Sequence, residues 1–163
     1  MNEFVDFKKR GVELGGGFKN LVDVLQAASV KSPVTACNPG EGLSQVERYV
    51  TRFLLSAAEF RLLSISDLQH QVTIFVECRS GVLDAVVIFR IANTLVEQTV
   101  REVFSDAGLA SLWETVIDVR RLVKYPLPST ASQITDLFVR LMRKIADSPE
   151  HIRLHFRYHE KKS

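Results

Sequence analysis

Residues 72–90 read VTIFVECRSGVLDAVVIFR, and this stretch decides the fold class. Two runs rich in β-branched residues, 72–78 and 82–91, flank the dipeptide Ser80-Gly81. β-Branched and aromatic residues favour strands, and a two-residue connection with glycine is typical of a tight hairpin. The stretch therefore predicts an antiparallel hairpin that turns at Ser80-Gly81.

A turn at Ser80-Gly81 also fixes which residues face each other across the hairpin. One face then carries only apolar side chains, in the pairs Val72 with Phe89, Ile74 with Val87, Val76 with Ala85 and Cys78 with Leu83. The other face is mixed: Phe75, Val86 and Ile88 form an apolar centre, bordered by the pairs Gln71 with Arg90 and Glu77 with Asp84. We expect the first face to be core and the second to have a partial cover.

Helical and strand periods continue on both sides of the hairpin. Apolar residues at helical spacing predict helices over about 18–28, 44–58, 94–108 and 129–147, and strands are expected near residues 63–65, at 116–123 and at 151–158. The order is α-α-β-β-β-α-β-α-β. The last two helices each join strands through short loops, which favours parallel crossovers. We therefore expect an α+β fold, with a single mixed, partly parallel sheet of about five strands and amphipathic helices mainly on one face.

Composition is typical of a globular domain. The 163 residues are 46% hydrophobic and 25% charged, with a formal net charge of +2. Loop-forming residues before position 43 predict an N-terminal arm over 1–42, with a short helix and a loop, and a single α+β domain over 43–163. Two cysteines without metal-ligand spacing and the absence of a long apolar run predict a soluble, cytoplasmic protein with no cofactor, no metal and no membrane association.

The mixed face of the hairpin raises the question of what covers it. One alternative is intramolecular, with the N-terminal helix or the helix of residues 44–58 lying across Phe75, Val86 and Ile88. The other is a second copy of the chain, because homodimers reuse such half-apolar faces. A small-molecule pocket is a third possibility. The three residues are thus candidate interface residues.

Glu77 and Asp84 are a candidate carboxylate pair, because the register places them opposite each other. Two carboxylates that close repel, so one pKa rises unless a cation lies between them. Acid–base chemistry or binding of a divalent metal is one interpretation. A pair near the hairpin tip that is solvated, or neutralised by an arginine such as Arg79, is the simpler one.

The last predicted strand has an unusual alternation. His151, Arg153, His155, Arg157 and His159 occupy its odd positions, and the even positions between them are apolar. Alternation places all five on one face of a strand. The histidines lie too far apart on a strand to share a metal ion, so the candidate chemistry is binding of phosphates, nucleic acid or an acidic partner. An ordinary solvated face is the alternative.

Other motifs give weaker signals. Gly15-Gly16-Gly17 precedes a predicted helix but lacks both dinucleotide and P-loop spacing, so a hinge is the better interpretation. Cys37, His70 and Asp67 have the residue types of a cysteine nucleophile with its base, but the sequence does not place them together.

Three functional hypotheses follow. The first is a non-enzymatic protein-binding module that self-associates as a homodimer. The second is an anion or nucleic-acid binder that uses the His/Arg strand; residues 114–163 support it because they hold ten Lys/Arg and only six Asp/Glu. The third is a small hydrolase or transferase that uses the carboxylates or Cys37.

Overall fold

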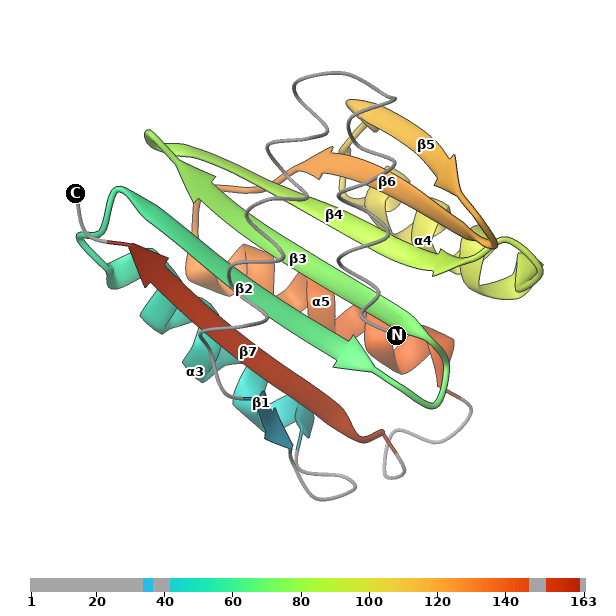
Figure 1. Ribbon diagram of the computed structural model, residues 1–163, viewed down its shortest axis with the longest axis horizontal. Coiled ribbons are helices and arrows are strands. Elements are labelled where there is room, and N and C mark those ends of the chain that lie inside the picture. The colour runs from blue at the N-terminus through green and yellow to red at the C-terminus, as the bar shows by residue number, and fades with distance from the viewer. Residues whose placement is uncertain (1–33, 37–41, 147–151, 162–163) are drawn as a thin grey trace.

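The computed structural model describes residues 34–36, 42–146 and 152–161. In these residues, one seven-stranded sheet packs against three helices, and Figure 1 shows all three helices on the same side of it. The strands are β1 (Val34–Ala36), β2 (Phe60–Asp67), β3 (Val72–Arg79), β4 (Val82–Arg90), β5 (Trp113–Ile117), β6 (Arg120–Pro126) and β7 (Leu154–Lys161). The helices are α3 (Gly42–Leu55), α4 (Thr94–Asp106) and α5 (Ala131–Ile145).

The strand order is β1-β7-β2-β3-β4-β6-β5, and every pair of neighbours is antiparallel. The prediction of a partly parallel sheet of about five strands is therefore wrong. The crossovers do exist: β5 runs in the same direction as β4, and β7 runs in the same direction as β6. However, β6 lies between β4 and β5, and three strands separate β6 from β7, so strands of equal direction are never neighbours.

The strand count was too low because β1 was not predicted and because residues 113–126 contain a second hairpin. The sequence predicted one strand over 116–123, whereas β5 ends at Ile117 and β6 begins at Arg120. Asp118 has a φ of 54°, and aspartate is one of the few residues other than glycine that tolerates this left-handed conformation. The turn lacks glycine, so the local signal that identified the first hairpin is missing here.

The hairpin of β3 and β4 has the predicted register. Ile74 pairs with Val87, Glu77 with Asp84 and Arg79 with Val82. Ser80 and Gly81 both have positive φ, 51° and 80°, as a type I′ turn requires.

The helix boundaries lie within three residues of their predicted positions. Asn93 caps α4 by accepting a hydrogen bond from the backbone N–H of Val96. Thr130 caps α5 through the N–H of Gln133. Helix α3 begins at Gly42, two residues before the predicted start, where a Cβ atom would lie 2.9 Å from Leu154 Cβ. Only glycine allows this close approach of α3 to β7.

The main core lies between the helices and the face of the sheet that they cover, here called the helix face. Phe89, Phe104, Phe138 and Phe156 are all fully buried in it. Tyr49 of α3 stacks on Phe156 with ring centroids 4.4 Å apart, and Phe104 of α4 stacks on Tyr125. The predicted apolar face of the first hairpin belongs to this core.

Most of the predicted N-terminal arm lies outside the described residues, as do Gly15-Gly16-Gly17, Cys37 and His151. The exceptions are Gly42 and β1, which pairs with β7. Within the part of the chain that is described, no helix is long and apolar enough to cross a membrane.

Candidate anion-binding site

The face of the sheet that points away from the helices, here called the open face, has an apolar patch of its own. Because successive side chains of a strand point to opposite faces, every second residue of each strand lies on the open face. Phe75, Val86 and Ile88 form a cluster there and are only 6%, 2% and 5% exposed within a single chain. Leu62, Ile117 and Leu122 complete the cluster.

The position of α3 excludes one of the covers that the sequence suggested. Helix α3 packs against α5, β7 and β2, on the helix face, so the helix of residues 44–58 does not lie across Phe75. The other intramolecular candidate, the helix near residues 18–28, lies outside the described residues. Because Phe75, Val86 and Ile88 are buried already in one chain, they do not form an exposed apolar surface.

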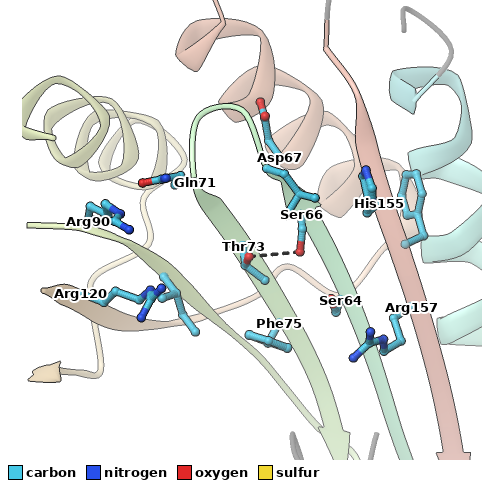
Figure 2. A pocket seen from close by; sticks show the side chains of 13 residues that line it. Ser64, Ser66, Asp67, Gln71, Thr73, Phe75, Arg90, Arg120, His155 and Arg157 are labelled. Atoms are coloured by element: carbon cyan, nitrogen blue, oxygen red, sulfur yellow. Dashed lines mark hydrogen bonds between the residues drawn. The ribbon is translucent and has the colours of Figure 1, made fainter. Parts of the chain in front are cut away.

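A pocket of about 430 Å³ opens at one end of this face. Figure 2 shows Arg90 and Arg120 on one side of it and His155 and Arg157 on the other. Arg90 and Arg120 come from β4 and β6, where they are register partners. His155 and Arg157 come from β7, two residues apart on one strand face.

The floor between the two sides is partly polar and partly apolar. Ser64 and Ser66 of β2 lie beside β7, opposite Arg157 and His155. The hydroxyls of Ser66 and Thr73 are 3.1 Å apart and share a hydrogen bond, while Phe75 and Ile88 supply the apolar part of the floor. The floor can therefore form hydrogen bonds with polar groups of a ligand and also contact its apolar groups.

Arg157 is a partly buried cation of the pocket. Burial lowers the pKa of its guanidinium, and its buried Nε has no hydrogen-bond partner. Among the described residues, no carboxylate forms an ion pair with Arg157 or Arg90, and such an unpaired, partly buried cation is costly. An anion in the pocket would offset that cost.

Asp67 is the one carboxylate that lines the pocket among the described residues, and it is engaged elsewhere. Its oxygens accept hydrogen bonds from the backbone N–H of His70, at 3.1 Å, and lie 2.7 Å from His70 Nδ1. Figure 2 shows the carboxylate pointing away from the arginines. Asp67 and His70 therefore brace the turn between β2 and β3. Cys37, which has the residue type of a nucleophile but was not placed near these two residues by the sequence, lies outside the described residues.

Glu77 and Asp84 lie opposite each other, as the register requires, but outside the pocket. Arg79 Nε is 3.3 Å from Glu77 Oε1, and Lys124 Nζ is 3.3 Å from Asp84 Oδ2. Burial is the largest influence on both carboxyls and raises the pKa of each, against the lowering effect of these cations. The arrangement is two adjacent ion pairs. In the described part of the chain, no group of three or more His, Cys, Asp or Glu side chains has a geometry that could hold a metal ion.

The structure brings only part of the predicted row of His and Arg residues on the last strand into the pocket. His155 and Arg157 line the pocket, whereas His159 lies beside the ring of Phe60, with centroids 6.2 Å apart. Arg153 is exposed and precedes β7, which begins at Leu154. Two of the five residues therefore contribute to the pocket, and His151 is not among the described residues.

Arg90 and Arg120 are the residues that the sequence did not single out. The hairpin register already placed Arg90 on the mixed face beside Gln71, which also lines the pocket. Nothing local indicated that β6 would bring Arg120 beside it, because that position depends on the sheet order. Comparisons with protein-family models, with curated proteins and with solved structures found no match to this chain.

Proposed function

We propose that this protein is a binding module for a small anionic ligand, which it holds in the pocket of the open face. The observation that carries the proposal is the partly buried guanidinium of Arg157, which lines the same cavity as Arg90 and, among the described residues, has no carboxylate partner and no hydrogen-bond partner for its buried Nε. A guanidinium presents a planar fork of donors that matches carboxylate and phosphate oxygens. The natural complement of this site is an anion.

Size favours a small ligand over a nucleic-acid strand. The cavity of about 430 Å³ lies in the range of small-molecule pockets. Its floor contains Phe75 and Ile88, which suit an apolar part of the ligand. A nucleic-acid surface would need a longer track of exposed cations with stacking aromatic side chains. On β7, Arg157 is followed by His159 packed beside Phe60, outside the pocket.

Ion pairs elsewhere in the molecule support the same function. Glu97 and Glu114 pair with Arg101 and Arg121 on the helix face, and Glu77 and Asp84 pair with Arg79 and Lys124. These acidic groups are engaged with other cations, and among the described residues that line the pocket Asp67 is the one carboxylate beside three arginines. Self-association as a homodimer remains a separate prediction, and burial of Phe75, Val86 and Ile88 in one chain speaks against those residues as its interface.

Isothermal titration with phenyl phosphate tests the proposal, because this probe joins an anion to a flat apolar ring. We expect saturable binding to the full chain that weakens when salt is raised, and loss of that binding in Arg157→Met. Arg140→Met is the matched control, because Arg140 is an exposed residue of α5 outside the pocket. Equal losses in both variants, or no binding at millimolar probe, would contradict the proposal. So would tighter binding of a short oligonucleotide that depends on Arg153.

A further inference from the structure

Ser64 supplies the floor of the pocket with a buried hydroxyl. The residue is only 9% exposed and lines the pocket, and within the described ranges its hydroxyl has no hydrogen-bond partner. It lies on β2 directly opposite Arg157 of β7, and side chains in such pairs have Cβ atoms about 4.5–5.5 Å apart. Figure 2 shows the guanidinium of Arg157 extending from β7 toward β2. A guanidinium and an unengaged hydroxyl are therefore neighbours in the pocket.

A second hydroxyl donor lies beside this pair. Ser66 follows on the same face of β2, and its hydroxyl shares one hydrogen bond with that of Thr73 on β3. Each hydroxyl has one proton to donate, so the bond uses one of the two protons and leaves the other for a ligand. An anion beside Arg157 thus meets donors from three neighbouring strands, β7, β2 and β3.

The placement of these donors distinguishes between the common biological anions. A carboxylate has two oxygens in one plane, and a bidentate contact with a guanidinium uses that plane. A phosphate monoester has three terminal oxygens, which point in different directions. It can therefore bond to the guanidinium of β7 and, out of that plane, to the hydroxyls of β2 and β3. The donors favour a tetrahedral group.

Charge favours the same group. Arg157 and Arg90 have no carboxylate ion pair among the described residues, and Asp67 is engaged with His70. Arg157 is partly buried and Arg90 is exposed, so solvent screens Arg157 less and it contributes the larger attraction. A phosphate monoester carries a charge of about −1.5 to −2 near neutral pH, whereas a sulfate ester, a phosphate diester or a carboxylate carries a single charge. A doubly charged group gains from both arginines.

We propose that the anionic group of the ligand is a phosphate monoester, held by Arg157 and the hydroxyl of Ser64, with its apolar ester group on Phe75 and Ile88. The chemical class is a small phosphorylated phenol or alcohol. This inference rests on the proposed anion-binding function and adds the identity of the anion and the hydroxyl that recognises it.

Four probes with the same aromatic ring separate charge from shape: phenyl phosphate, methyl phenyl phosphate, phenyl sulfate and phenylacetate. Isothermal titration of the full chain at pH 8 measures their affinities. We expect phenyl phosphate to bind about tenfold tighter than the two singly charged tetrahedral probes, because it alone is doubly charged. Phenylacetate should bind most weakly, because it also lacks the third oxygen.

The variant Ser64→Ala tests the hydroxyl. A hydrogen bond to a charged group is among the stronger ones, so we expect phenyl phosphate to bind about tenfold more weakly to this variant. Phenylacetate should change by less than about twofold, because its two oxygens are held by the guanidinium. Ser105→Ala is the matched control, because Ser105 is an exposed residue of α4 outside the pocket. Circular dichroism and thermal melting of both variants exclude unfolding as the cause.

The outcomes distinguish this inference from the function on which it rests. If all four probes bind equally and Arg157→Met abolishes their binding, the anion-binding function stands and the preference for a phosphate monoester is refuted. If Ser64→Ala weakens phenyl phosphate and phenylacetate by the same factor, or neither of them, recognition by this hydroxyl is refuted. If no probe binds, both proposals fall.

Discussion

The helix face and the open face of the sheet both bury large apolar side chains, but they place those side chains in different surroundings. On the helix face, Phe89 lies in a continuous core formed by the sheet and three helices. On the open face, Phe75 belongs to a small cluster that borders a pocket lined with arginines. The same two-residue alternation thus produces a stabilising layer on one side and a candidate binding surface on the other.

The largest expected effect comes from the helix face. Phe89→Ala should lower the free energy of unfolding by about 3–5 kcal/mol, because the residue is fully buried and its removal leaves a cavity among packed side chains. Urea denaturation followed by circular dichroism measures the change. A loss below about 1 kcal/mol would mean that the core does not depend on this side chain.

The matched substitution on the open face sharpens the comparison. Phe75→Ala should cost less, about 1.5–3 kcal/mol, because the space it vacates joins a pocket that water can enter and only the transfer term is lost. The same denaturation experiment gives the value. If Phe75→Ala proved as costly as Phe89→Ala, the open face would be a closed core and the distinction between the faces would fail.

A smaller effect concerns pH and the carboxylates of the open face. Because burial raises the pKa of Glu77, the native state holds the proton more strongly than the unfolded chain does. Its contribution to stability is complete below the pKa of the unfolded state and is lost as the pH rises through the raised native pKa. Denaturation at pH 4 and pH 7 should show Glu77→Gln gaining stability relative to the wild type as the pH increases. A difference that is constant with pH, or a variant that loses relative stability as the pH rises, would contradict the raised pKa, because a dominant ion pair with Arg79 would favour the wild type once Glu77 is ionised.

The smallest expected change is in the stability of Arg157→Met. The substitution removes a partly buried cation that has no carboxylate partner within the described part of the chain, and it keeps a side chain of similar length, so the melting temperature should stay the same or rise slightly. Differential scanning calorimetry in anion-free buffer provides the measurement. A clear loss of stability would show that Arg157 serves the fold and not a ligand.

These two faces also show how far the sequence alone leads. The register of β3 and β4 was predictable because the turn residues Ser80 and Gly81 and the alternation of side chains are local signals. The antiparallel sheet was not predictable, because β6 enters between β4 and β5 through a turn at Asp118 that lacks glycine, and β7 returns to β2 from the far end of the chain. Neither β6 nor β7 contains a local signal that tells which strands it pairs with.

The candidate site likewise contains residues that local signals predict and residues that only the sheet order brings together. Arg157 and His155 were predictable from the alternation within β7, whereas Arg90 and Arg120 belong to the site only because the sheet order places β4 and β6 across from β7. Sequence periodicity gives the face on which a side chain lies. It does not give the strands that share that face, and a binding site on a sheet needs both.

The place of β7 in the sheet has a consequence for how the protein reaches its native state. Strands β2, β3 and β4 are consecutive and pair through short turns, so they can assemble from local contacts soon after they leave the ribosome. Strand β7 is the last in chain order, yet it pairs on both sides, with β1 and with β2. Its docking requires closure of a loop that contains most of the molecule. We therefore expect the side of the pocket that carries His155 and Arg157 to be the last part of the sheet to form, so that an early folding intermediate would have the first hairpin but no complete site.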